Sequence, residues 1–241
     1  MFQTLLTQPL YNGFIYLIGI APGGDVGFAI IALTFIVRFL FYPVFAAQIR
    51  STMGMQAMQG ELEEIREKYK NNKEEQVKHM QGLYKKYNVN PLAFILSLFI
   101  QLPIFLALYY AFFHTALPKV NADLLYPFVA NPAAVDIHFL GFLNLTQAHD
   151  IPLAIVVAVL QYLVMHFTLS RTNKHAAKHI SAEKLEAQKL QQNIMLYMMP
   201  AIIASITYSL PSAVGLYFVA GNIISLGQEW LIRHELDKKP L

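Results

Sequence analysis

An apolar stretch with one charge inside it, VGFAIIALTFIVRFLFYPVFAA at residues 26–47, decides the fold class. Its 22 residues are enough to cross a bilayer core of about 30 Å as a helix, which takes roughly 20 mostly apolar residues. Its single charged side chain, Arg38, would cost about 2.5–3.5 kcal/mol at the centre of a membrane helix and does not lose its proton. The stretch therefore predicts a membrane-spanning helix whose arginine faces something other than lipid.

The composition of the chain also indicates a membrane protein. Of the 241 residues, 56% are hydrophobic and 14% are charged, whereas an average soluble domain has roughly 45–50% apolar and about 25% charged residues. This balance excludes a disordered chain and an ordinary cytosolic enzyme. The sequence contains no cysteine, which excludes disulfides, a thiolate nucleophile and a Cys-ligated zinc site.

Four further stretches have the length and polarity of a membrane span. We predict an all-α integral membrane protein with five transmembrane helices, at residues 26–47, 91–116, 151–170, 194–210 and 211–232. The fourth is the shortest and contains Pro200, which predicts a kink that neighbouring helices accommodate. Pro211 leaves almost no loop between the fourth and fifth spans, which indicates a tight hairpin.

The distribution of lysine and arginine predicts the orientation. Sixteen of the 18 lie in three segments outside the spans: residues 48–90, residues 171–193 and the tail after the fifth span. The other two are Arg38, inside the first span, and Lys119. The positive-inside rule places these three segments in the cytoplasm. We therefore expect a cell-membrane protein with an external N-terminus, an external loop at 117–150, a cytoplasmic loop at 171–193 and a cytoplasmic tail at 233–241.

The end of the chain is expected to meet negative surfaces. Glu229, Arg233, Lys238 and Lys239 should lie at the cytoplasmic interface, where basic side chains attract anionic lipid headgroups and ribosomal RNA. A role in fixing the orientation of the last span explains each of these residues as well as a contact with lipid or RNA does.

Two segments outside the spans also have a helical pattern. Residues 1–25 mix apolar and polar side chains and lack the lysine or arginine of a signal peptide. They predict an amphipathic helix in the external interface, broken near Pro9, with a sixth, poorly formed span as the alternative. Residues 48–90 combine i,i+4 Glu–Lys pairs with two apolar stripes on either side of Asn71, which predicts a mobile cytoplasmic helical hairpin rather than a solvated loop.

Polar side chains recur at the depth of Arg38. A rise of 1.5 Å per residue places Arg38 about 14 Å from the cytoplasmic end of its helix, too deep to reach the interface easily. The same arithmetic places one polar residue of each other span near this level: Gln101, Gln161, Ser205 and Asn222. Each alone would be an interhelical hydrogen bond worth about 1 kcal/mol. A structural ion pair is the alternative for Arg38, but Glu229 is the only acidic residue in the other four spans. The polar residues at the depth of Arg38 therefore predict a hydrated pocket open to the cytoplasm.

Several motifs resemble, in order and spacing, those of the YidC/Oxa/Alb family of membrane protein insertases. They are VRF at 37–39, YP at 42–43, KYK at 68–70, LYKK at 83–86, NP at 90–91, QLPIF at 101–105, LY at 108–109, MMP at 198–200, LPS at 210–212, GLY at 215–217 and Asn222. The chain departs from the common bacterial pattern at Phe94, Ile95 and Ser97, where the family often has Gly-Cys and Pro. It also has Phe218 in place of a frequent tryptophan. We expect a minimal form, without the large external domain that precedes the first span in Gram-negative relatives.

The resemblance implies a membrane protein insertase and chaperone that is not an enzyme and uses no cofactor or metal. Nascent membrane proteins would enter the bilayer through a hydrophilic, positively charged groove that is open to the cytoplasm and to lipid. The expected groove residues are Arg38, Gln101, Gln161, Ser205, Tyr217, Phe218 and Asn222. The expected partners are nascent membrane proteins, the ribosome and membrane lipids, with the Sec translocon as an open alternative and no DNA.

Two other function classes fit part of the pattern. An anion channel or small transporter would use Arg38 for selectivity, but it would need a second polar ring or inverted repeats. A membrane enzyme would need a nucleophile, an acid or metal ligands at one depth, and the nearest candidates are His166, His175 and His179.

Overall fold

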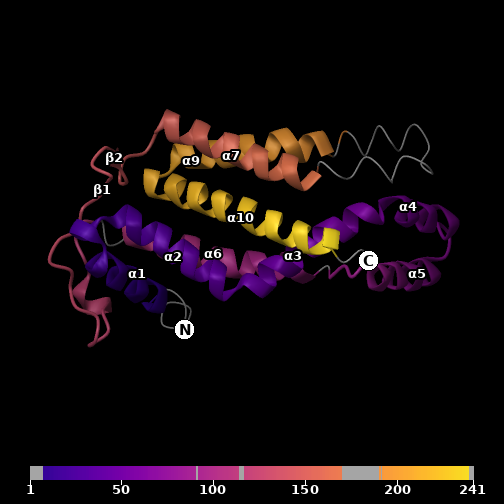
Figure 1. The fold of residues 1–241 in the computed structure, drawn as a ribbon, viewed down its shortest axis with the longest axis horizontal. Coiled ribbons are helices and arrows are strands. Elements are labelled where there is room, and N and C mark those ends of the chain that lie inside the picture. Colours follow the sequence, from indigo (N-terminus) through magenta and orange to yellow (C-terminus); the bar gives the residue numbers. More distant parts are fainter. Residues whose placement is uncertain (1–7, 91, 114–116, 170–189, 191, 239–241) are drawn as a thin grey trace. The chain divides into compact units, whose positions relative to one another are not determined.

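The computed structural model describes residues 8–90, 92–113, 117–169, 190 and 192–238. Helices account for most of them (Figure 1). The elements are α1 (Gln8–Ile20), a 3₁₀ turn (Pro22–Gly24), α2 (Val26–Leu40), α3 (Tyr42–Ala57), α4 (Gln59–Lys68), α5 (Lys73–Lys86), α6 (Leu92–Phe113), a second 3₁₀ turn (Ala122–Leu124), β1 (His138–Phe139), β2 (Leu143–Asn144), α7 (Ile151–Leu169), a π-helical turn (Ile194–Met198), α9 (Met199–Ser209) and α10 (Ser212–Lys238). The expected all-α class is right for all but the two short strands.

The chain divides into two compact units. The first consists of Met1–Phe41, Leu98–Gln161 and Pro200–Ser225, and the second of Tyr42–Ser97, Tyr162–Met199 and Leu226–Leu241.

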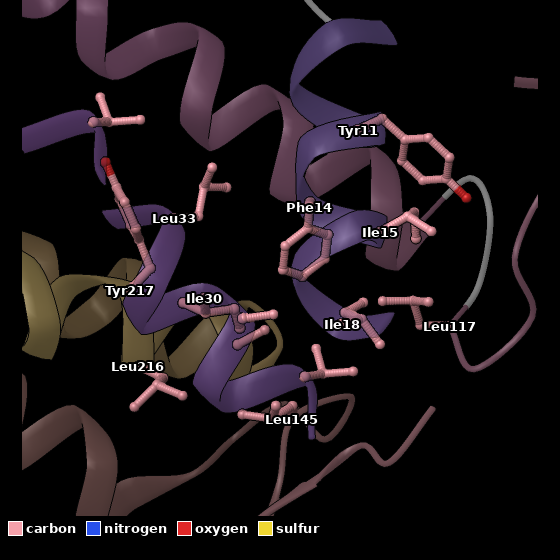
Figure 2. Close-up of a cluster of buried hydrophobic side chains, with 14 of the residues drawn as sticks. Tyr11, Phe14, Ile15, Ile18, Ile30, Leu33, Leu117, Leu145, Leu216 and Tyr217 are labelled. Atoms are coloured by element: carbon pink, nitrogen blue, oxygen red, sulfur yellow. The ribbon is translucent and has the colours of Figure 1, made fainter. Parts of the chain in front are cut away.

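The core of the first unit is the seam between α1 and α2. On α1 the buried side chains recur at helical spacing, at Tyr11, Phe14, Ile15 and Ile18. They pack with Ile30, Leu33 and other buried residues of α2, and the cluster extends to Leu117, Leu145, Leu216 and Tyr217 (Figure 2). The cluster therefore joins the two helices to the 117–150 loop and to the first half of α10.

Buried polar side chains hold the 117–150 loop on α1. The Nδ2 of Asn12 donates to the carbonyl of Leu124 (2.8 Å), and its Oδ1 accepts from the backbone N–H of Tyr126 (2.6 Å). The hydroxyl of Tyr11 accepts from the N–H of Asn121 (3.1 Å). Because an unpaired amide would be costly in this core, these bonds fix one position of the loop.

The α4–α5 pair (residues 59–86) has a small core of its own in the second unit. Met58, Leu62, Leu83 and Val89 are buried together, with partly buried side chains packed around them. Asn72 caps the start of α5 by accepting from the N–H of Glu75 (3.2 Å). The two helices lie side by side (Figure 1) because each directs a narrow apolar stripe at the other.

The close approach of the chain after α5 to α3 depends on a glycine. A Cβ on Gly54 would lie 2.6 Å from the carbonyl oxygen of Tyr87. The N–H of Asn90 donates to the hydroxyl of Ser51 on the same helix (3.0 Å). Residues 48–57, expected as part of the cytoplasmic hairpin, are thus the second half of α3, and the α4–α5 pair begins at Gln59.

The structure differs from the predicted spans in length and continuity. Among the described residues, α7 alone is long and apolar enough to cross a membrane, and α2 with α3 would form a second span if counted together. The expected helix at 26–47 is interrupted at Phe41 (φ −98°, ψ 19°), because Pro43 has no N–H for the Phe39 carbonyl. The five-span arrangement stays a prediction.

Other boundaries differ in smaller ways. Pro9 is the second residue of α1, where its missing N–H breaks no helical bond, so the described part of the helix has no break there. A π-helical turn lies just before Pro200, at the expected kink. The expected tail at 233–241 continues α10 as far as Lys238. The expected loop at 171–193 falls almost entirely outside the described residues, together with His175, His179, Lys239 and residues 1–7.

Candidate functional site

Arg38 lies in the last turn of α2, between the buried and exposed faces of that helix. Val37 and Thr34 beside it are buried, whereas Phe35 and Phe39 are exposed. As a whole residue Arg38 is half-buried, and its Nη2 lies 3.7 Å from the position that a Cβ on Gly221 would take. Arg38 therefore faces α10 within the first unit.

Tyr217 and Gln101 form a hydrogen-bonded pair near this arginine. Tyr217 is buried on α10, and Gln101 on α6 directs its Nε2 to the tyrosine hydroxyl. Arg38 lies within electrostatic range of the same phenol. Phe218 is half-buried, and its ring centroid lies 5.7 Å from that of Tyr217. Three helices, α2, α6 and α10, thus contribute a cation, an amide and a phenol.

Asn222 adds a polar group on α10, one residue beyond Gly221. Its side chain is buried, and its Nδ2 has no hydrogen-bond partner among the described residues. A buried amide N–H without a partner costs roughly 1–3 kcal/mol unless water or a ligand group accepts from it. Asn222 is therefore suited to a hydrated contact.

Two of the expected groove residues are placed differently. Ser205 is exposed on α9, where its carbonyl accepts from the Ser209 hydroxyl (2.8 Å). Gln161 is half-buried on α7. The structure brings together Arg38, Gln101, Tyr217 and Phe218, but it does not turn Ser205 inward.

Thr207 is the buried polar residue of α9 that depth arithmetic missed. It is 1% exposed, and its Oγ1 has no hydrogen-bond partner among the described residues. Two residues of helix correspond to a rotation of about 200°, so Ser205 and Thr207 lie on nearly opposite faces. The position of a residue along a span gives its depth in the membrane but not the face of the helix on which it lies. A separate signal for the buried face is needed to choose between Ser205 and Thr207.

A buried ion pair joins α10 to the end of α7 in the second unit. Arg233 and Glu229 are 6% and 3% exposed, and Arg233 Nη2 lies 2.7 Å from Glu229 Oε1. The same Nη2 donates to the carbonyls of Phe167 (2.6 Å) and Thr168 (3.1 Å), and the Thr168 hydroxyl donates to Glu229 Oε2 (2.8 Å). The expectation that these two residues meet lipid or ribosome at the interface is wrong, because their charged groups are satisfied inside the protein.

The match to known protein families decides the class of the chain. The family model described as 60Kd inner membrane protein matches residues 19–239. The chain belongs to this family. The resemblance of its motifs to the YidC/Oxa/Alb insertases is thereby confirmed.

Named relatives within the 60Kd inner membrane protein family cover most of this chain. A "Membrane protein insertase YidC" of Buchnera aphidicola subsp. Acyrthosiphon pisum is 34% identical over 238 residues, which are 97% of this chain and 38% of the relative. The protein of the same name from Oceanobacillus iheyensis is 32% identical, with 88% of this chain and 76% of the relative covered. "Membrane protein insertase YidC 1" of Halalkalibacterium halodurans is 31% identical, with 88% and 71% covered. The chain spans less than half the length of the Buchnera relative.

The described residues of this 60Kd inner membrane protein family member contain no group of three His, Cys, Asp or Glu side chains that could hold a metal ion. What the site offers instead is a fixed positive charge with hydrogen-bonding groups beside it. Such a set of groups can attract an anionic group by its charge and can form hydrogen bonds with a polar one.

Proposed function

We propose that the chain is a membrane protein insertase and chaperone that works without a catalytic residue or a cofactor. The observation that carries the proposal is the position of Arg38 on an apolar helix beside the Gln101–Tyr217 pair and Gly221. A membrane protein keeps a charge among apolar helices where function requires it. The insertase names of the relatives support the same function.

In this proposal five helices span the cell membrane, with the N-terminus outside and the C-terminus in the cytoplasm. Arg38, Gln101, Tyr217 and Asn222 line a hydrophilic groove that is open to the cytoplasm and to lipid. Gln161 and Phe218 border it, and Thr207 takes the role expected of Ser205 on α9. Gln101 and Asn222 offer amide groups, which replace part of the water that a polar segment loses.

The groove lowers the cost of moving an acidic segment of a nascent protein part of the way across the membrane. Two unit charges about 6 Å apart interact by roughly 3 kcal/mol at an effective dielectric constant of about 20. This attraction matches the cost of about 2.5–3.5 kcal/mol for one acidic residue at the centre of a membrane helix. Burial of the apolar substrate span in lipid, at about 25 cal/mol per Å², drives the step, and the membrane potential assists acidic segments.

The proposed partners follow from this mechanism. Nascent membrane proteins and lipids contact the groove, and the ribosome contacts basic residues of the cytoplasmic side, with the Sec translocon as a further candidate. Since Arg233 is buried in an ion pair, the α4–α5 pair supplies the exposed basic residues for that contact, among them Lys78 and Lys86.

Charge variants of Arg38 test the proposal in proteoliposomes. Substrates are a series of single-span proteins whose external segments carry increasing numbers of acidic residues. Arg38→Lys should retain most of the insertion, because attraction to a carboxylate needs a charge and not a bidentate geometry. Arg38→Ala should lose insertion in proportion to substrate charge, by at most about a hundredfold per acidic residue for a loss of roughly 3 kcal/mol.

The matched control is Arg50→Ala, which removes a half-exposed arginine of α3 and should leave insertion unchanged. Thermal unfolding of every variant is measured in parallel. Equal loss for neutral and acidic substrates, with a lower unfolding temperature for Arg38→Ala, would show that Arg38 is a structural residue. Anion flux through the liposomes without insertion would establish the channel alternative instead.

A further inference from the structure

The turn between β1 and β2 carries two large apolar side chains on the surface of the first unit. Leu140 is 57% exposed and Phe142 is 77% exposed. The five residues from 139 to 143 read FLGFL and contain no charge. A surface of this kind is unfavourable in water unless something covers it.

The turn is held firmly, so its exposure is a property of the fold. Phe139 and Leu143 pair across the two strands. The carboxylate of Asp25 caps α2 by accepting from Gly27 N–H (2.7 Å), and its other oxygen accepts from the N–H of Leu140 (3.2 Å). The start of α2 and the tip of the turn are therefore fixed to each other through one side chain.

Leu140 occupies a backbone conformation that leucine rarely adopts. Its φ is 52°, and the φ of the following Gly141 is 79°. Tight hairpin turns with positive φ at adjacent positions favour Asn-Gly or Asp-Gly. A leucine here is strained and exposed at once, and strain of this kind points to a function for the side chain.

The apolar turn is continuous with an exposed aromatic stripe on α2. Phe139 packs edge-on against Phe28, with ring centroids 5.5 Å apart. Gly27 makes room for it, because a Cβ there would lie 2.2 Å from the Phe139 ring. Phe28, Phe35 and Phe39 are all exposed and recur at i, i+7 and i+11, along one face of the helix.

Lipid is the occupant that suits this surface. In a member of an inner membrane protein family, an exposed stripe of phenylalanines along an apolar helix faces the bilayer. With α2 spanning the membrane as proposed, the turn extends that stripe beyond the first residue of α2, toward the headgroups. We infer that the β1–β2 turn inserts Leu140 and Phe142 into the membrane interface and anchors the 117–150 loop to the lipid. The inference rests on the membrane placement of α2 in the proposed function, but not on insertase activity.

Single-tryptophan fluorescence tests the anchor. The chain has one tryptophan, Trp230, so Trp230→Phe gives a silent background. Phe142→Trp places a probe at the tip, and Leu140→Trp provides a second one. The matched control is His138→Trp, because His138 is exposed and next to the turn, but lies outside the apolar run 139–143 and beside the charged Asp136.

Each protein is reconstituted into phosphatidylcholine vesicles with and without brominated acyl chains. We expect tryptophan at 142 to emit at shorter wavelength than tryptophan at 138, to lose intensity in brominated vesicles and to resist quenching by aqueous iodide. Quenching by iodide and not by brominated lipid would overturn the inference, and so would equal lipid quenching at both positions. Protection from both quenchers would show a protein on the turn instead of lipid.

An insertion assay on the same vesicles separates this inference from the proposed function. Intact insertion with no lipid quenching at 142 would overturn the anchor alone. Lipid quenching at 142 without insertion would support the anchor and count against the insertase proposal.

Discussion

At the scale of single residues, the carboxylate of Glu61 connects the two ends of the α4–α5 pair. Lys86 Nζ lies 2.8 Å from both carboxylate oxygens, and the Tyr87 hydroxyl donates to one of them (2.6 Å). The hydrogen bonds from Lys86 and Tyr87 lower the pKa of Glu61. The hydrogen bond to Glu61 in turn raises the pKa of Lys86.

These shifts predict how the pair responds to pH. Because the pKa of Glu61 is lowered on folding, its contribution is complete above the ordinary glutamate pKa of about 4.3 and is lost as the pH falls through the lowered value. The contribution of Lys86 is complete below the ordinary lysine pKa of about 10.4 and is lost as the pH rises through the raised value. Amide exchange in α4 and α5, corrected for intrinsic rates, should therefore accelerate as the pH falls below the ordinary glutamate pKa. It should also accelerate as the pH rises above the ordinary lysine pKa.

The acid limb of this profile has a specific control. Glu61→Gln should abolish the acceleration at low pH, whereas Glu63→Gln should retain it, since Glu63 pairs with Arg66 inside α4. An unchanged acid limb in Glu61→Gln would assign the pH response to another group.

Individual site residues could be predicted from the sequence only where their depth along a span was enough to identify them, without knowledge of the buried face of the helix. Arg38 was identifiable as a charge in an apolar stretch, and the structure sets Gln101 and Tyr217 beside one another near it. Ser205 was chosen by its level in the span, although the face of α9 makes Thr207 the buried residue. The face is fixed by contacts such as that between Thr207 and α10 at Gly215, which no local pattern contains.

At the scale of elements, the Arg233–Glu229 pair fixes the end of α7 on α10. Removing one partner of a buried ion pair leaves the other charge uncompensated, at a cost of about 3–5 kcal/mol. We expect Arg233→Met to lower the thermal unfolding temperature in detergent strongly. The double variant Arg233→Met with Glu229→Leu should recover much of the loss, because it removes both charges.

The control for this prediction is an exposed ion pair between α3 and α10 in the same unit. Arg50 and Glu235 lie 3.2 Å apart and are about half exposed, and pairs of this kind contribute about 0–1 kcal/mol. Arg50→Met should therefore leave the unfolding temperature nearly unchanged. Equal losses in Arg233→Met and Arg50→Met would mean that burial adds nothing to the first pair.

Elements followed the sequence where the pattern was local and departed from it where distant partners intervene. Apolar periodicity predicted helices at α1, α2, α4, α5, α6, α7, α9 and α10. The break at Phe41 follows from Pro43, a signal that was present in the stretch 26–47 but outweighed by its length. The β1–β2 pair has only two residues per strand, so no strand pattern marks it in the sequence. Asp25 accepts from Leu140 in its turn, and Ala213 of α10 donates to Leu145 just after β2.

At the scale of the whole molecule, each compact unit has its own buried cluster. The cluster around α1 and α2 lies in the first unit, and the cluster around Met58 and Leu83 lies in the second. Within the second cluster the four buried residues flank the base of the α4–α5 pair, together with the bond between Glu61 and Lys86. The distal part of the pair contributes partly buried side chains at its inner face, Ile65 and Met80, and is otherwise mostly exposed.

This division allows the function of the pair to be separated from its role in stability. A variant with residues 66–80 replaced by a short Gly-Ser turn keeps the base cluster and Glu61, Lys86 and Tyr87. Because little apolar surface is lost, its thermal unfolding temperature should stay close to that of the parent. Insertion should nevertheless fall, since the proposed early contact with nascent chain or ribosome is removed. Ribosome binding, measured by co-sedimentation, should weaken with rising salt in the parent and lose most of that salt dependence in the variant. Unchanged insertion would show that the distal pair has no part in it, and a large fall in unfolding temperature would show that the pair is a structural element.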